Sequence, residues 1–271
     1  MFSKLELYIN FISVSVLLFV ILFYTMYPIM SRHLNPKQIL TLTTVLKFRY
    51  VTTDNLASFR GITQNSAYST LQILNANGYV GKIYQKSYHL LNKSARYCLT
   101  AQAIEYLREV AKLQLPNAVW NSYKHDANRS PDFVDQQVAI HAAYNELTCL
   151  FGKDATIHVP FDLRSSQDVI RPLPSLFIEL KSGKRCFVEL TDGQHLFIAK
   201  KRVRQYITHY DSNDWEWESY PEVYFVRASA AERSKLRAYI TEKMEDGYLD
   251  ADDFTFHVVK DVAATAKQLL S

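Results

Sequence analysis

The spacing of apolar residues changes several times along the chain, and each change predicts an element. Two short apolar runs, Ser175–Leu180 and Arg185–Leu190, flank the polar break Lys181–Lys184. A glycine within a short polar break is typical of a hairpin turn. From Leu196 to Tyr210 the apolar residues recur at helical spacing. This stretch therefore predicts a strand, a turn, a second strand and a helix.

Further elements follow the same rules in the second half of the chain. Helical spacing predicts helices at Phe133–Phe151 and Ser229–Asp246. Runs of β-forming residues predict strands at Thr156–Phe161, Glu222–Arg227 and Phe254–Val259. With the hairpin and its helix, the order becomes α-β-β-β-α-β-α-β. That order predicts a mixed sheet flanked by helices, in an α+β or α/β fold.

Residues 31–114 predict a separate unit, a winged helix-turn-helix. Pro36 suits the first position of one helix, Thr53 caps a short second helix, and Thr63 caps a third. Tyr79–Tyr97 then alternates between apolar and polar residues, as a hairpin does. The third helix would be the one that enters the major groove of DNA.

Outward-facing residues of the third helix carry amide, hydroxyl and phenol groups, which can contact base edges and phosphates. Basic residues on the hairpin would contact the DNA backbone. The predicted DNA-binding residues are Gln64, Asn65, Tyr68, Ser69, Gln72, Lys86, His89, Lys93 and Arg96. A winged helix that is used only for protein contacts is the alternative interpretation.

Two segments lie outside these units. Residues 1–30 contain the apolar run 8–29, which as a helix would extend about 33 Å and cross a bilayer. The basic residues that follow would place a single-pass anchor with its chain on the cytoplasmic face of the inner membrane. A start at Met30, which would leave a cytoplasmic protein, and a buried helix are the alternatives. Residues 115–132, rich in Pro, Asn and Ser, are expected to form a linker.

The distribution of charge favours a polyanionic partner for the first half. Residues 31–125 hold 12 Lys and Arg against 3 Asp and Glu, a net charge of +9. Residues 126–271 hold 18 Lys and Arg against 23 Asp and Glu, a net charge of −5. Nucleic acid is the partner that this asymmetry suggests, although two domains can differ in charge by chance. The 3 cysteines form no CxxC pair, which argues against a zinc site or a disulfide framework.

The hairpin also predicts which residues lie side by side. With the turn centred between Ser182 and Gly183, Leu176 would lie opposite Glu189. The start of the first strand would then lie beside the end of the second. Nucleases of the PD-(D/E)XK type hold their metal ion at such a place, with an Asp early in one strand and Glu-x-Lys on the next. Two carboxylates bind Mg²⁺ there, and the Lys orients the attacking water.

This chain matches that pattern in part. Ser175 stands in the place of the Asp, Glu189 in the place of the Glu, and Thr191 in the place of the Lys. A rearranged site would use Glu189, Asp192 and Lys200, with Glu189 as the metal ligand. Loss of one of two carboxylates weakens a Mg²⁺ site, so a sheet without catalytic activity is the preferred interpretation. No cofactor is expected, except Mg²⁺ if the site is active.

The sequence resembles the replication-relaxation family, which includes mobilisation proteins of the MobC type from plasmids and conjugative elements. The resemblance covers about residues 35–259 and includes the stretches LTAQAIEYL, VAIHAAYNELTCLF, FVELTDG and YPEVYFV. It implies a DNA-binding winged helix in the first half. It also implies a PD-(D/E)XK-like, restriction-endonuclease-like domain in residues 133–271. Some members of the family are relaxases that nick DNA at a transfer origin.

Three functions are therefore compared. The first is a DNA-binding protein of a bacterial mobile element that acts in plasmid replication or conjugative mobilisation, with a degenerate nuclease-like domain. The second is an active metal-dependent nicking endonuclease. The third is a membrane-tethered adaptor between proteins. The partners expected are double-stranded DNA, conjugation or replication proteins, the inner membrane through residues 8–29, and a second copy of the chain.

Overall fold

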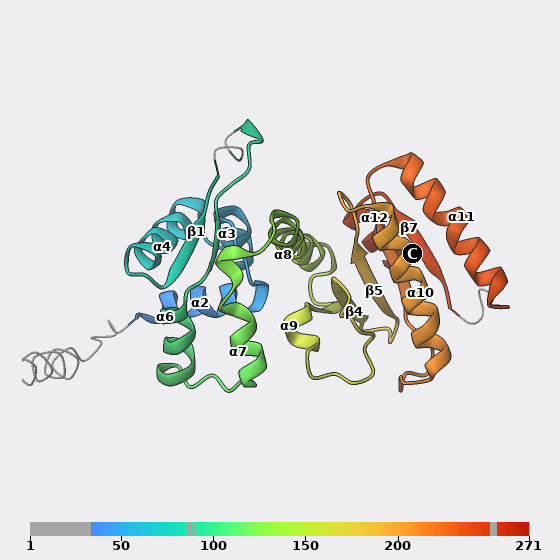
Figure 1. Cartoon of the computed structure of the whole chain (residues 1–271), viewed down its shortest axis with the longest axis horizontal. Coiled ribbons are helices and arrows are strands. Elements are labelled where there is room, and N and C mark those ends of the chain that lie inside the picture. Colours follow the sequence, from blue (N-terminus) through green and yellow to red (C-terminus); the bar gives the residue numbers. More distant parts are fainter. Residues whose placement is uncertain (1–33, 86–87, 89, 250–253, 271) are drawn as a thin grey trace, which may run out of the picture. The chain divides into compact units, whose positions relative to one another are not determined.

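The computed structural model describes residues 34–270, except 86–87, 89 and 250–253 (Figure 1). It has a mixed α/β architecture, with a five-stranded sheet in the second half of the described chain. The apolar run 8–29 lies outside the described residues. Among the helices that are described, none is both long enough and apolar enough to span a membrane.

Helix caps in the first half follow local side-chain chemistry. The elements are α2 (Pro36–Phe48), α3 (Thr53–Arg60), α4 (Gln64–Ala76), β1 (Val80–Ile83), β2 (Arg96–Leu99), α6 (Ala101–Glu105) and the π-helix η1 (Tyr106–Val110). Thr63 caps α4 as predicted, and its hydroxyl accepts a hydrogen bond from the Ser66 N–H at 3.3 Å. The cap of α3 is Thr52 and not the predicted Thr53, because the Thr52 hydroxyl accepts from the Asn55 N–H at 3.2 Å. Two adjacent threonines made either cap compatible with the sequence.

A tight turn joins α3 to α4. Gly61 ends α3 with a φ of 60°, and its N–H donates to the Ser58 carbonyl at 3.2 Å. This left-handed conformation carries a steric penalty for residues with a Cβ, so glycine suits the position. Leu56 of α3 and Leu71 of α4 are fully buried. The turn thus holds the two helices together through their apolar sides.

The predicted hairpin is present as β1 and β2. The strands pair in antiparallel orientation from Val80↔Leu99 to Ile83↔Arg96. Val51 adds an isolated bridge to Tyr97 on the other edge of β2. All four residues of β2 are buried.

The segment that was predicted to be a linker is folded. It contains α7 (Asn117–Tyr123) and the short 3-10 helix η2 (Asp126–Asn128). Trp120 and Tyr123 of α7 are buried. The Tyr123 hydroxyl donates to the Leu46 carbonyl of α2 at 2.7 Å. Residues 115–132 are therefore fastened to the first half and do not form a free linker.

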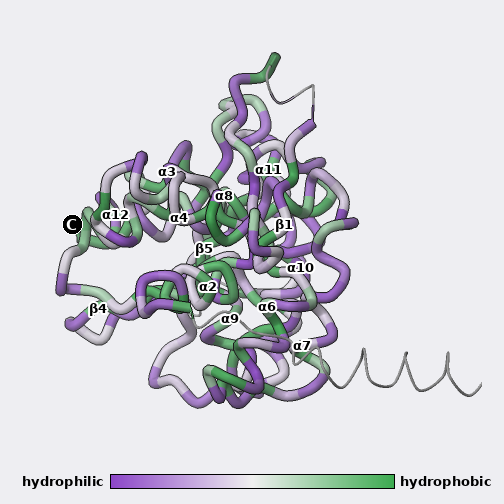
Figure 2. Tube along the Cα trace, turned by 90° about the vertical axis from the view of Figure 1, so that its left-hand side faces the viewer, coloured by the Kyte–Doolittle hydropathy of each residue, from purple (hydrophilic) through white to green (hydrophobic). Residues whose placement is uncertain are grey.

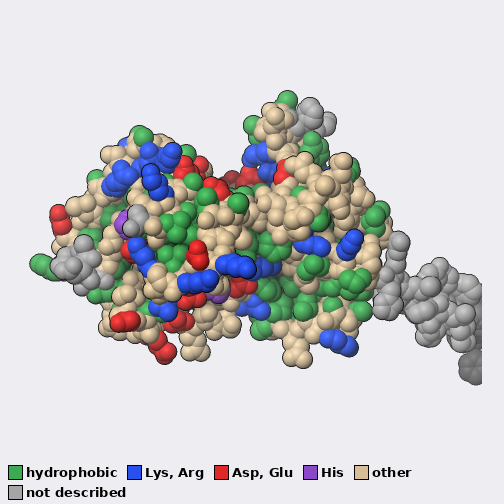
Figure 3. All heavy atoms as spheres, turned by 180° about the vertical axis from the view of Figure 1, so that it is seen from behind, with side chains coloured by type: hydrophobic (Ala, Val, Ile, Leu, Met, Phe, Trp, Pro, Cys, Tyr) green, Lys and Arg blue, Asp and Glu red, His purple; other side chains and the backbone are tan. Residues whose placement is uncertain are grey.

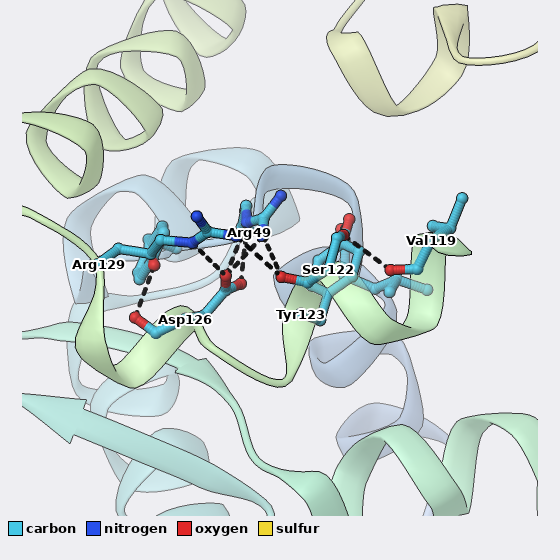
Figure 4. A network of polar contacts seen from close by, with 8 residues as sticks. Arg49, Val119, Ser122, Tyr123, Asp126 and Arg129 are labelled. Carbon is cyan, nitrogen blue, oxygen red and sulfur yellow. Dashed lines mark hydrogen bonds and ion pairs between the residues drawn. The ribbon is translucent and has the colours of Figure 1, made fainter. Parts of the chain in front are cut away.

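A buried ion pair holds this segment in place (Figure 4). The side chain of Asp126 is completely buried, and its Oδ1 accepts from Arg49 Nη2 at 2.7 Å. Arg49 Nε also donates to Oδ1, at 2.9 Å. The Tyr50 hydroxyl donates to the Asp126 backbone carbonyl at 2.7 Å. Burial raises the pKa of Asp126, whereas the hydrogen bonds and charge of Arg49 oppose that rise.

The sheet of the second half combines two kinds of connection. Its strands are β3 (Ala155–His158), β4 (Leu176–Leu180), β5 (Arg185–Leu190), β6 (Glu222–Val226) and β7 (Phe256–Val259), in that spatial order. Neighbours from β3 to β5 are antiparallel, and neighbours from β5 to β7 are parallel. The parallel pairs require crossovers, which α10 (Leu196–Ser212) and α11 (Ala230–Asp246) provide. The mixed sheet predicted from the sequence is confirmed.

Helices cover both faces of the sheet (Figure 1). Phe187 and Phe225 share one core cluster with Val203 of α10 and Leu236 of α11. Side chains alternate along a strand, so the intervening residues face the opposite side. There the sheet meets α8 (Pro131–Phe151) and α12 (Val262–Leu270), while α9 (Pro160–Leu163) follows β3. Figure 2 shows hydrophobic (green) segments where the helices and strands lie together near the label α8, and hydrophilic (purple) segments in several of the outer loops.

The predicted register of the β4–β5 hairpin is wrong by one residue. Leu176 pairs with Val188 and not with Glu189. The turn has three residues, because the Gly183 N–H donates to the Leu180 carbonyl at 2.9 Å and Gly183 has a φ of 89°. A turn of this type adds one residue in the left-handed region, which shifts the register by one relative to a symmetric turn.

An unusual histidine lies where α8 packs against the first half. His141 is fully buried, and its ring stacks on Phe48 with the ring centres 3.7 Å apart. Phe59 of α3 approaches the same ring edge-on at 5.7 Å. Neither ring nitrogen has a hydrogen-bond partner among the described residues. Burial lowers the pKa of His141 from 6.5 to about 3, so the folded protein keeps this ring neutral.

The Asp126 ion pair predicts unequal effects of two arginine substitutions. Arg49→Met leaves a completely buried carboxylate without its closest cation and is expected to cost about 3–5 kcal/mol of unfolding free energy. Arg129 lies 3.8 Å from the same carboxylate, with 41% of its side chain exposed. Arg129→Met is therefore expected to cost less than about 1 kcal/mol. Urea unfolding measures both values, and equal losses would contradict the assignment.

His141 predicts a pH-dependent loss of stability. Between pH 6.5 and about pH 3 the unfolded chain binds a proton that the folded chain excludes. Wild-type stability is therefore expected to fall more steeply as the pH decreases through this window than that of His141→Phe. The difference reaches up to about 1.4 kcal/mol per pH unit. Parallel curves of unfolding free energy against pH for the two proteins would refute it.

Candidate functional site

The outer side of α4 presents polar side chains to solvent. Four of the five predicted α4 contacts are exposed, namely Gln64, Asn65, Tyr68 and Ser69. Tyr68 is 52% exposed, which is high for so large a side chain. Gln72 is half-buried, and its Nε2 donates to the Tyr97 hydroxyl at 2.9 Å. Gln72 therefore links α4 to β2 and is less available to a ligand than the other four.

The basic residues predicted for the hairpin are arranged differently. Lys86 and His89 lie outside the described residues. Lys93 Nζ lies 2.6 Å and Arg96 Nη2 lies 2.9 Å from the carboxylate of Asp135 on α8. Arg96 is 5% exposed, and its guanidinium carbon lies 4.3 Å from the centre of the Tyr88 ring, so in this arrangement it is less available to a DNA backbone than predicted. Burial would raise the pKa of Asp135, but the hydrogen bonds from Lys93 and Arg96 outweigh it and hold that pKa below its usual value.

Other cations of residues 31–125 also pair with acids of residues 126–271. Lys47 lies 2.9 Å from Asp162, and Arg49 binds Asp126. These ion pairs neutralise part of the excess positive charge that the sequence shows for residues 31–125. Figure 3 shows the same mixing on one face, where basic (blue) and acidic (red) side chains lie next to one another. Part of this charge excess therefore forms ion pairs within the protein.

Glu189 lies buried against α10. Arg202 Nε donates to its Oε1 at 2.9 Å, and Arg202 Nη2 donates to the same oxygen. The Tyr206 hydroxyl donates to Oε1 at 2.7 Å. Arg202 and Tyr206 are four positions apart on α10, which brings both side chains to one side of the helix. Two other basic residues near Glu189 in the sequence have different neighbours, since Arg185 pairs with Glu179 and Lys200 lies over the Tyr239 ring.

The electrostatics of this cluster oppose a metal ion. Burial alone would lower the pKa of Arg202, but the Glu189 carboxylate outweighs that effect and raises it. Burial, and then the charge of Glu189, raise the pKa of Tyr206 well above its usual value. Both groups therefore keep their protons at neutral pH. A divalent cation at Glu189 would have to displace or approach a fixed guanidinium, which repels it.

The other two members of the rearranged site have separate partners. Asp192 Oδ1 accepts from the Ala228 N–H at 2.9 Å, beyond the end of β6. Lys200 Nζ lies 4.5 Å from the centre of the Tyr239 ring on α11. The predicted set of Glu189, Asp192 and Lys200 thus has no shared contact. Within the described ranges, no group of three or more His, Cys, Asp or Glu side chains is placed to hold a metal ion.

Ser175 has a structural contact at the position where a nuclease would place an aspartate. Its hydroxyl accepts from the Leu190 N–H at 3.1 Å. Gln136 of α8 donates to the Leu190 carbonyl at 2.8 Å. Sequence reasoning missed Gln136, Arg202 and Tyr206. The four-residue spacing of Arg202 and Tyr206 indicates that both lie on one side of a helix and could have suggested a shared partner. No local pattern connects Gln136 to a strand residue 54 positions away in the chain.

No protein-family model, curated protein or solved structure matches this chain. The functional interpretation therefore rests on the residues and contacts described above.

The Glu189 cluster predicts a structural role that can be separated from metal binding. Arg202→Met leaves a buried carboxylate without its cation and is expected to cost about 3–5 kcal/mol of unfolding free energy. The double variant Glu189→Met with Arg202→Met is expected to regain most of that loss, because two apolar side chains fill the same space. Arg185→Met is the matched control, since its pair with Glu179 is more than one-third exposed on both sides.

Urea unfolding of the four proteins measures these differences. Millimolar Mg²⁺ is expected to leave the wild-type melting temperature unchanged. A rise in melting temperature with Mg²⁺ that disappears in Glu189→Gln would instead identify a metal site.

Proposed function

We propose that this chain is a DNA-binding protein that contacts duplex DNA through α4. In this proposal residues 31–114 act as a winged helix-turn-helix, with α3 and α4 as its two helices and β1–β2 as the base of its wing. The exposed polar side of α4 is the observation that carries the proposal. It supplies amides for adenine edges and hydroxyls for phosphates.

The turn at Gly61 supports this assignment. A recognition helix must project from the helix before it at a fixed angle, and the capped, left-handed turn holds α3 and α4 in one arrangement. The N-terminal turn of α4 is free of acidic residues and carries Gln64 and Asn65. Helix N-termini attract phosphate groups through their unpaired N–H groups and the helix dipole.

The second half, in this proposal, is a nuclease-like sheet that has lost its metal chemistry. Ser175 lacks the carboxylate that a metal site would require, and Arg202 already neutralises Glu189. Such a domain can position DNA or a partner without cutting. The resemblance to the replication-relaxation family adds the expectation that the protein acts in plasmid replication or conjugative mobilisation, and residues 8–29 would anchor it to the inner membrane.

The α4 residues predict a specific loss of DNA binding. Duplexes selected from a randomised library by the wild-type protein serve as the ligand, and fluorescence anisotropy measures the affinity. Replacing Gln64 and Asn65 together by Ala is expected to weaken binding roughly 5- to 150-fold, the equivalent of about 1–3 kcal/mol for a good base contact. Tyr68→Ala is expected to weaken binding as well. Both changes replace exposed helical residues by alanine, which favours the helical conformation, so the fold is expected to be preserved.

Tyr248→Ala is the matched control, because Tyr248 is 97% exposed and lies two residues after the end of α11. Its affinity is expected to equal that of the wild type. If the α4 variants bound the selected duplexes as tightly as the wild type does, α4 would not be the contact with DNA. If no sequence were enriched from the library, the protein would not bind DNA sequence-specifically. The bound protein is also expected to leave supercoiled plasmid uncut in Mg²⁺. Relaxed circles from the wild type, absent with Glu189→Ala, would instead establish a nicking enzyme.

A further inference from the structure

A cleft lies where the end of α2 and α7 meet α8 and α9. It encloses ≈ 370 Å³. This volume is more than twice that of a cavity of about 150 Å³ that holds benzene, and it falls within the range of about 300–1,000 Å³ of small-molecule sites. Its walls are mainly apolar and come from Val119, Ile140, Val159, Phe161 and Leu173.

The charged groups of the cleft are all positive. Lys47, Arg49 and Arg164 line it, and the lining contains no Asp or Glu. Lys47 is paired with Asp162 and Arg49 with Asp126. Arg164 contacts Phe161, with its guanidinium carbon 4.0 Å from the ring centre and Nη1 donating to the Phe161 carbonyl. No carboxylate pairs with Arg164 in the part of the chain that is described.

The positive charges of Arg49 and Arg164 both act on Tyr123, which also lines the cleft. Burial raises the pKa of Tyr123, while the positive charges of Arg49 and Arg164 lower it. Arg49 also lies over the Tyr123 ring, with its guanidinium carbon 4.8 Å from the ring centre. Tyr123 is held by its hydrogen bond to the Leu46 carbonyl, and Arg49 by Asp126 (Figure 4). The side chains of Tyr123 and Arg49 are therefore fixed in place, and the guanidinium of Arg164 has no acidic partner among the described residues.

We propose that this cleft binds a small amphipathic anion, an organic carboxylate or sulfonate with an aromatic or aliphatic body. The anionic group would lie at Arg164, and the apolar body would lie against Val119, Ile140 and Leu173. An unpaired guanidinium at the edge of an apolar cleft favours this class over neutral ligands, because a charge-assisted hydrogen bond is stronger there than in water. A cation is disfavoured by all three basic side chains. This proposal does not depend on DNA binding.

The probe for the test is 8-anilinonaphthalene-1-sulfonate, with fluorescence as the readout. The wild-type protein is expected to bind one equivalent of the probe saturably. The anion 1-naphthoate is expected to displace the bound probe, whereas the neutral analogue 1-naphthalenemethanol is not. Arg164→Gln is expected to weaken binding of the probe by about tenfold or more, the value of a charge-assisted hydrogen bond. Ala118→Trp places a large ring on α7 at the cleft and is expected to abolish binding.

Arg108→Gln is the matched control, since Arg108 is an exposed arginine that is paired with Glu109. It is expected to bind the probe as the wild type does. All variants are checked by circular dichroism and by their melting transitions, and Val119→Trp replaces Ala118→Trp if the latter does not fold. Binding that is unchanged in Arg164→Gln and in the tryptophan variant would overturn the proposal, as would equal competition by the neutral analogue. Absence of saturable binding to the folded wild type would overturn it too.

Discussion

The buried carboxylate of Asp126 is the constraint on which the first half of this structure depends. A charge without access to water is stable only with a close partner, and Arg49 supplies it with two hydrogen-bonding nitrogens. Arg49 lies directly after α2 and has a left-handed φ of 69°. The pair fixes residues 115–132 on α2 and thereby shapes one wall of the cleft that contains Arg164.

Complementary charge is the second principle of this fold. Lys47, Lys93 and Arg96 of residues 31–125 form ion pairs with acidic residues of the second half. The more exposed of these ion pairs contribute little stability each, about 0–1 kcal/mol, but they select one arrangement of the partners. The exposed side of α4 carries no basic residue and presents amide and hydroxyl groups to solvent.

Glu189 shows how neighbours decide what a carboxylate does. On a strand that ends near water, with a second acid beside it, the same residue could bind Mg²⁺. Here Ser175 bonds to the backbone of β5, and Arg202 with Tyr206 encloses Oε1. The cluster ties α10 to the sheet and stabilises the crossover between β5 and β6. Its chemistry fits a structural support better than a hydrolytic site.

Local pattern alone determined most elements of this protein. Helical and alternating spacing identified α8, α10, α11 and the five strands in their order along the chain, because periodicity and capping act over a few residues. The predicted order lacked α9, part of which lies in the predicted strand Thr156–Phe161, and it lacked α12. Tertiary structure decided the rest. The one-residue register of β4 and β5 depends on the conformation of Gly183. The folding of residues 115–132 depends on Arg49, 77 residues away from Asp126 in the chain. The partners of Glu189 and the convergence of cations on the cleft follow from contacts between distant segments, which no local pattern encodes.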